Sequence, residues 1–386
     1  MADFTVVICG GGIAAIEGLL RLRRLAGDHV QVTLVSPEDE FVCRPVAVLE
    51  SFAVAGVRRY RLERIASDTG ARWVRDRLAR IDVDSCTVHT DGGRELSYDA
   101  LLIALGARES SPFEHAHVFT DRAAGESFRA IVQDIELGYV KSLAFVLPGG
   151  PVWPVPLYEL ALMTAERARS MSLDVQITFI TSEGRPLKAF GQTAGDAIVR
   201  LLGEAGIKLH TGVVARVPAP QLVTFGETQL HAERIVTLPR VTGPAVPGIP
   251  AGTDWFVPID ERCLVEQTNG RVFAAGDATD FAVKHGGIGA QQADTAAAGI
   301  AHLAGIVERP PPFDHVIRGM LLTGNRPLYL AARVIDGLGW RSEVYEQPPW
   351  QAEQKVVAEE LGPYLATLDA APDPPREAPL PADDRP

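Results

Sequence analysis

Cysteine is scarce in this 386-residue sequence: Cys9, Cys43, Cys86 and Cys263 are scattered and form no C-x-x-C pair. This spacing excludes a disulfide framework and offers no metal site of the Cys/His type, and it is typical of a reducing compartment. No apolar run reaches the roughly 18 residues that would indicate a membrane span. The first residues also lack the basic region of a signal peptide. We therefore expect a cytoplasmic protein whose membrane contact is at most peripheral.

Positive charge is also in deficit, because 49 acidic residues face 37 basic ones, for a net charge of -12. Nucleic-acid binding has no electrostatic support in such a chain. Apolar residues make up 46% of the sequence, which is enough to bury the cores of two or three domains. The composition thus favours a multidomain globular protein and makes anionic polymers poor candidates for a partner.

The sequence opens with a β-rich run over 5–9, a glycine turn, an apolar-periodic helix over 13–26 and a second strand over 31–36. The turn has the pattern G-x-G-x-x-A. In this pattern Gly10 permits a tight turn, Gly12 lets the backbone approach a pyrophosphate, and Ala15 allows the helix to pack closely on the strand. A glycine turn without a ligand is the alternative, but the strand and helix around it favour dinucleotide binding.

A second strand, turn, helix and strand follow over 143–147, 157–169 and 175–181. Later, a strand over 271–275 leads into a long helix over 286–304. Apolar stretches at 317–322 and 351–368 favour helices. Residues 369–386 are rich in proline and polar residues, so we expect them to be disordered.

Three further segments carry a family resemblance: 102–108 (LIALGAR), 272–278 (VFAAGDA) and 284–287 (KHGG). In order and spacing, the chain over residues 4–305 resembles the pyridine nucleotide-disulfide oxidoreductase superfamily, in the branch of sulfide:quinone oxidoreductases and type II NADH dehydrogenases. Residues 178–183, 190–191 and 206–207, with Phe41 and Pro45, are similar to that branch. The resemblance implies FAD as cofactor and an α/β fold of two Rossmann-like dinucleotide-binding domains.

The resemblance also implies roles for individual residues. Asp277 would hold the ribityl-pyrophosphate region of FAD, where a helix N-cap is the alternative role. Lys284 would lie at the flavin pyrimidine edge and stabilise the reduced ring, where a solvent-facing lysine is the alternative. Ser36 and Glu38 replace the usual acidic ribose ligand, or are solvated loop residues. The expected FAD contacts are Gly10, Gly12, Ile13, Ala14, Ala15, Ser36, Glu38, Arg44, Pro45, Leu78, Ala104, Gly106, Ala107, Gly276, Asp277, Lys284, Gly287 and Ile288, and the candidate catalytic residues are Lys284, Cys43 and Trp153.

Two departures limit what the resemblance implies about substrate. The turn at 149–154, where sulfide:quinone oxidoreductases would carry a redox cysteine, has Trp153 instead. The same turn has only Gly149 and Gly150 before its prolines, so it lacks the glycine pattern and the N–H groups that would cradle NADH. NAD(P)H binding stays open, because Glu183 sits where a ribose-binding carboxylate could. Trp153 could line a substrate pocket or belong to the core.

Cys43 lies in the loop after the second strand, where some flavin-linked peroxidases and disulfide reductases carry one redox cysteine. The neighbouring Arg44 could lower the pKa of its thiol, but free cysteines are more often inert core residues.

We expect an FAD-binding domain over 1–112 and 252–310, a second, NAD(P)-type Rossmann-like domain over 113–251, a C-terminal helical region over 311–368 that caps the fold, forms a homodimer or lies near a membrane, and a disordered tail over 369–386. The expected function is electron transfer from a small-molecule donor, with NAD(P)H open, through FAD to a quinone or other acceptor. The alternatives are a sulfur-compound or peroxide redox enzyme that uses Cys43, and a flavin-binding interaction or sensor protein without turnover.

Overall fold

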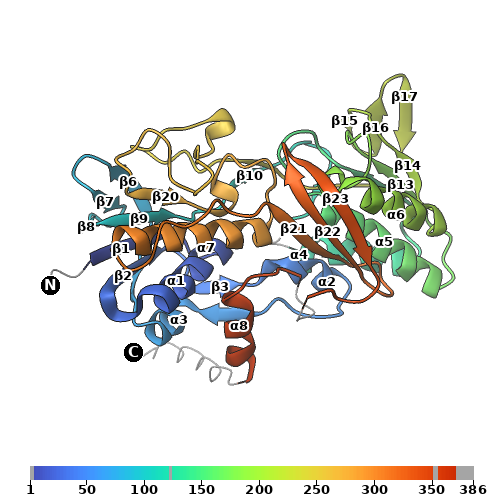
Figure 1. Ribbon diagram of the computed structural model, residues 1–386. Coiled ribbons are helices and arrows are strands. Elements are labelled where there is room, and N and C mark those ends of the chain that lie inside the picture. The colour runs from blue at the N-terminus through green and yellow to red at the C-terminus, as the bar shows by residue number, and fades with distance from the viewer. Residues whose placement is uncertain (1–3, 121–123, 351–354, 371–386) are drawn as a thin grey trace, which may run out of the picture.

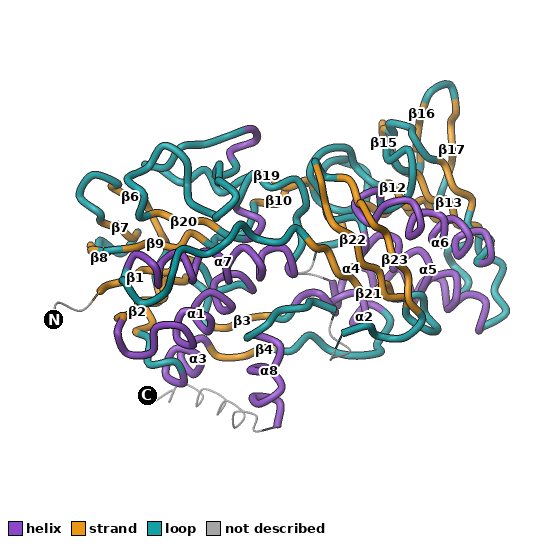
Figure 2. Tube along the Cα trace, in the orientation of Figure 1, coloured by secondary structure: helices purple, strands orange, loops and turns teal. Residues whose placement is uncertain are grey.

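The computed structural model describes residues 4–120, 124–350 and 355–370. Two parallel five-stranded sheets lie side by side, and a small antiparallel sheet from the C-terminal part of the chain stands between them (Figure 1). Helices and strands alternate along most of the chain (Figure 2). The α/β fold class predicted from the sequence is therefore confirmed.

The first sheet has the order β20-β9-β1-β2-β5, and all neighbouring strands are parallel. Its strands are β1 (Phe4–Cys9), β2 (Val30–Ser36), β5 (Arg72–Arg75), β9 (Ala100–Ile103) and β20 (Val272–Ala274). One face packs against α1 (Ile13–Ala26), α3 (Leu62–Asp68) and α7 (Gly286–Leu303). The other face is covered by the antiparallel sheet of β6 (Leu78–Asp82), β7 (Thr87–Thr90) and β8 (Glu95–Ser97), and by residues from the 246–265 segment.

The second sheet has the order β11-β18-β12-β13-β14 and is also parallel. Its strands are β11 (His117–Val118), β12 (Ser142–Val146), β13 (Gln176–Ile180), β14 (Lys208–His210) and β18 (Arg234–Thr237), and the helices of this half are α4 (Ala124–Glu136), α5 (Val155–Ser170) and α6 (Gly191–Glu204). An antiparallel sheet of β15 (Arg216–Ala219), β16 (Leu222–Phe225) and β17 (Thr228–His231) projects beyond it (Figure 1).

Short elements connect the two halves. The two chain crossings between them pair as the antiparallel strands β10 (Arg108–Ser110) and β19 (Arg240–Thr242). The loop after β2 contains β3 (Glu40–Val42), which pairs with β4 (Arg59–Arg61), and the short helix α2 (Ala47–Ser51), which packs on α4 and α5. Both connections hold the carboxyl ends of β1 and β2 close to the second half.

The helical prediction for residues 317–322 was wrong. This segment lies in β21 (Val316–Leu321), which forms an antiparallel sheet with β22 (Leu328–Ile335) and β23 (Leu338–Tyr345). Burial alternates along β21, so that Ile317, Gly319 and Leu321 face the core while their neighbours are partly exposed. A period of two, rather than 3.6, is the pattern of a half-buried strand.

The helix predicted over 351–368 is shorter than expected and starts later. Within the described residues, 355–360 are not helical and α8 spans Leu361–Ala370, so Asp369 and Ala370 belong to a helix and not to a disordered tail. The Glu17 carboxylate accepts hydrogen bonds from the backbone N–H groups of Glu360 and Leu361, which sets the start of α8 at this point. Residues 351–354 and 371–386 lie outside the described residues. We call residues 355–370 the C-terminal strap.

Candidate active site

The glycine turn between β1 and α1 leaves the helix N-terminus open to a ligand. Gly10 has a φ of +138°, and a Cβ there would lie 2.1 Å from the backbone oxygen of Ala104, the residue after β9. A Cβ on Gly12 would have no heavy atom within 4 Å. The close approach of β9 therefore requires Gly10, while the backbone of Gly12 is free to approach a pyrophosphate at the positive end of the α1 dipole.

The end of β2 carries the predicted ribose contacts. Ser36 is fully buried, and its hydroxyl donates a 3.0 Å hydrogen bond to Oε2 of Glu38. The buried serine therefore positions the carboxylate of Glu38. Of these two side chains, Glu38 is the one that can contact a ribose. Leu78, by contrast, opens β6 and packs against the core beneath the other face of the first sheet.

Gly276 and Asp277 lie where β20 meets the N-terminal turns of α7. Gly276 has a φ of +80°, and a Cβ on Gly289 would lie 3.0 Å from its Cα. The N–H of Gly276 donates a 2.8 Å hydrogen bond to the buried side chain of Gln292. Partial burial raises the pKa of Asp277, and Lys284 opposes that shift. A carboxylate is thus held beside two packed glycines, as a cofactor contact at this helix would require.

Lys284 is not the solvent-facing lysine of the alternative interpretation. Its side chain is buried, its Nζ donates to the carbonyl oxygen of Thr279, and the ammonium lies 3.6 Å from the ring centroid of Phe256. Burial lowers the pKa of Lys284 to about 8, while Asp277 and Asp280 oppose the shift. At pH 7 the group therefore keeps its proton and places a positive charge just before the first turn of α7.

Trp153 and His285 meet across the interface between the two halves. Trp153 ends the turn that precedes α5, and its ring centroid lies 4.5 Å from that of His285 and 5.7 Å from that of Phe190. His285 is the N-cap residue of α7 and only 6% exposed. Burial lowers the pKa of His285 to about 4, with a further contribution from Lys355, so the imidazole is neutral at pH 7.

The loop of Cys43, Arg44 and Pro45 does not activate the thiol. Burial raises the pKa of Cys43, and the cation that opposes this shift is Arg58, not Arg44. The role considered for Arg44 falls to Arg58 instead, whose backbone also lies beside Cys43 and accepts a 3.0 Å hydrogen bond from its N–H. A thiol with a raised pKa carries little thiolate and is a weak nucleophile.

The carboxylate of Glu183 already has hydrogen-bond donors within the protein. It is buried, accepts a 2.9 Å hydrogen bond from the Tyr158 hydroxyl, and also accepts from the N–H groups of Leu187 and Lys188. These contacts leave it little capacity for a ribose. The Tyr158 ring stacks on Phe179 at 4.2 Å, so this tyrosine is a core residue and does not line a pocket.

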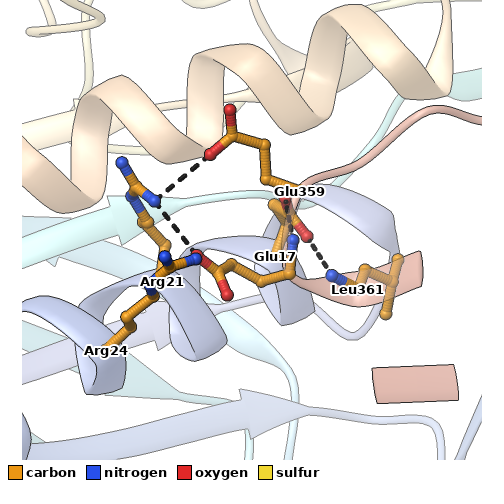
Figure 3. A network of polar contacts seen from close by, with 6 residues as sticks. Glu17, Arg21, Arg24, Glu359 and Leu361 are labelled. Atoms are coloured by element: carbon orange, nitrogen blue, oxygen red, sulfur yellow. Dashed lines mark hydrogen bonds and ion pairs between the residues drawn. The ribbon is translucent and has the colours of Figure 1, made fainter. Parts of the chain in front are cut away.

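Two buried carboxylates that hold the strap, Glu17 and Glu159, were not predicted from the sequence. Glu159 in α5 is fully buried and pairs with Lys355 of the strap at 2.5 Å. Glu17 in α1 binds the strap backbone, and beside it Arg21 pairs with Glu359 and Glu360 (Figure 3). A charged residue on the buried face of a predicted helix was the available signal for Glu17 and Glu159, but their partners are 343 and 196 residues away in sequence.

Comparison with known proteins agrees with this geometry. The family model described as pyridine nucleotide-disulphide oxidoreductase matches residues 4–299. The chain belongs to this family. Membership confirms the predicted FAD-dependent oxidoreductase, and the open glycine turn and the Gly276–Asp277 segment fit that cofactor. Bound FAD supplies the redox chemistry, and the protein positions it.

Two curated relatives are named for sulfide and quinone. The chain is 26% identical over 300 residues to the sulfide-quinone reductase of Aquifex aeolicus, covering 71% of this chain and 68% of that protein. It is 31% identical over 107 residues to the mitochondrial sulfide:quinone oxidoreductase of Mus musculus, covering 27% of this chain and only 23% of the mouse protein.

Solved structures share the fold. The sulfide:quinone oxidoreductase of Aquifex aeolicus has a TM-score of 0.78 at 20% identity, covering 89% of this chain and 86% of that chain. A NAD-dependent persulfide reductase from A. fulgidus has a TM-score of 0.63 at 18% identity, covering 87% of this chain and 65% of that chain.

No helix in the described part of the chain combines the length and apolar character needed to cross a bilayer. Within the same residues, no group of three or more His, Cys, Asp or Glu side chains is arranged to hold a metal ion.

Proposed function

We propose that this protein passes electrons from a small donor through FAD to a quinone. The observation that carries the proposal is the convergence of a buried ammonium, a carboxylate and an aromatic pair at the N-terminus of α7. Lys284, Asp277 and His285 lie on the side of the first sheet, and Trp153 meets His285 from the side of the second. The likeness to sulfide-quinone reductases favours a quinone as acceptor.

The protein's own residues would hold and tune the cofactor without acid or base chemistry. The protonated Lys284 and the positive end of the α7 dipole favour negative charge on a ring placed beside them. Gly10 and Gly12 leave room for the pyrophosphate, and Glu38 can contact the ribose. A relay through Cys9, Cys43 or Cys263 is not supported, because burial raises the pKa of each of these thiols.

The donor is tested by anaerobic titration of the FAD-containing protein with NADH, NADPH and sulfide in turn, followed by flavin absorbance. Bleaching by one of the three identifies the donor class, and reoxidation on addition of a soluble benzoquinone is expected. Bleaching by NADH or NADPH would show that the second half binds a nicotinamide without a second glycine turn. A flavin that no donor bleaches, or that a quinone fails to reoxidise, would contradict the proposal and favour a binding or sensor role.

A further inference from the structure

His285 carries a buried polar atom without a partner. Its Nδ1 is buried and makes no hydrogen bond within the described residues. Buried polar side chains in folded proteins are hydrogen-bonded in the large majority of cases, and an exception calls for a functional explanation. The imidazole is held in place by its position at the start of α7, where its Cε1 and Nδ1 lie against Gly287. A fixed, unused hydrogen-bonding group at the interface is suited to a ligand.

The surroundings of His285 are aromatic. The Trp153 ring lies 4.5 Å from the imidazole at an interplanar angle of 43°, and Phe190 lies beyond it. Trp153 is only partly buried, whereas His285 behind it is 6% exposed, so the indole is the part of the pair that solvent reaches. An aromatic wall of this kind favours a flat ring that can pack against it in an offset or edge-to-face arrangement.

Charge at this place is balanced within the protein. Lys355 and Glu159 lie near His285, and their 2.5 Å ion pair leaves neither charge free. The imidazole itself is neutral at pH 7, because burial and Lys355 disfavour its protonated form. An ionic ligand would therefore find no unpaired counter-charge here, whereas an uncharged ring that bears an oxygen acceptor would satisfy the free nitrogen of His285.

We propose that Trp153 and His285 form the binding site for a quinone headgroup, with the ring packed on Trp153 and a carbonyl oxygen accepting a hydrogen bond from the imidazole. The inference rests on the proposed function, since it assigns the acceptor of that reaction to a site. It places the acceptor on the turn where relatives would carry a cysteine or a second glycine motif. It also explains why an aromatic residue stands there.

The test is calorimetric titration of the oxidised, FAD-containing protein with 2,3-dimethoxy-5-methyl-1,4-benzoquinone. In His285→Leu the quinone oxygen would be buried without its hydrogen-bond donor. The dissociation constant of the quinone is therefore expected to rise about tenfold. His285→Asn keeps an N–H near the position of Nδ1 and is expected to restore most of the affinity. Trp153→Leu is expected to weaken binding several-fold, roughly the value of one aromatic pair. The control Trp255→Leu removes a tryptophan that is 63% exposed and should leave binding unchanged.

The flavin absorbance spectrum and FAD content of each variant separate this site from the cofactor site, and both are expected to be unchanged. Wild-type affinity in both His285→Leu and Trp153→Leu would overturn the inference while leaving the proposed electron transfer intact. Loss of flavin from both His285 variants, with full quinone affinity in Trp153→Leu, would also overturn it, because the imidazole would then serve the cofactor. Failure of the wild-type protein to bind the quinone at all, with donor reduction preserved, would refute the quinone acceptor itself.

Discussion

The ion pair between Glu159 and Lys355 provides the sharpest test of how the strap is held. The Glu159 side chain is 0% exposed and that of Lys355 is 8% exposed, with 2.5 Å between Oε2 and Nζ. Oε1 of Glu159 also accepts a 3.0 Å hydrogen bond from the N–H of Leu322, just after β21. In Lys355→Met the carboxylate would stay buried without its cation. Removing one partner of a buried pair typically costs about 3–5 kcal/mol in the free energy of unfolding.

The measurement is urea unfolding of Lys355→Met, Glu159→Gln and the double variant, which together give the coupling energy. The double variant is expected to recover much of the loss, because replacing both partners removes the unpaired charge. Arg200→Met is the matched control, since Arg200 and Glu204 are 67% and 63% exposed and such a pair contributes about 0.5 kcal/mol. A loss in Lys355→Met no larger than that of the control would refute the reasoning.

Four further outcomes are expected. Gly10→Ala would place a Cβ 2.1 Å from the Ala104 oxygen, so the protein should purify with little FAD, measured by its visible absorbance. Burial and the Glu17 charge raise the pKa of Asp294 from 3.8 to about 8. The folded state therefore holds this proton more tightly, and the free energy of unfolding should fall as pH rises between these values and level off above 8. Asp294→Asn should flatten that dependence in urea melts at a series of pH values; an unchanged slope would contradict the assignment. Lys284→Met should make the flavin potential more negative in a spectroelectrochemical titration, because a cation that favours the reduced ring is lost. Cys43→Ser should leave donor-to-quinone turnover unchanged, since burial raises the pKa of this thiol, and a large loss would revive the cysteine mechanism.

Local pattern was sufficient for the parts of the fold whose periodicity is long and regular. The helices at 13–26 and 286–304 and the strands at 5–9, 31–36, 143–147, 175–181 and 271–275 appear in the structure within a residue or two of their predicted ends. The segment at 317–322 failed because a six-residue apolar run fits a strand as well as a helix, and its identity depends on pairing with β22. Short runs of this kind are decided by tertiary contacts that the local sequence does not contain.

Some residues of the candidate site could also be predicted from local pattern, whereas others depend on distant contacts. Gly10 could be predicted because a positive φ and the close approach of Ala104 restrict the residue type, which leaves a readable pattern, and Gly12 followed from the same pattern. Gly276, Trp153 and Lys284 were predicted through the resemblance. The partners of His285 were not predicted, since its contacts come from a turn more than 100 residues earlier and a strap that follows 70 residues later.

The strap explains why the stability of this protein and the shape of its active site depend on each other. Lys355 pairs with α5 in the second half, Val356 packs against Gly286 at the N-terminus of α7, and Glu360 and Leu361 bind Glu17 in α1. One short segment thus connects both halves directly beside the interface where Trp153 and Lys284 lie. Because each half contributes one wall of that interface, a change that releases the strap should loosen the walls relative to each other before it disturbs either sheet. Weakened quinone binding should therefore accompany the loss of stability in Lys355→Met.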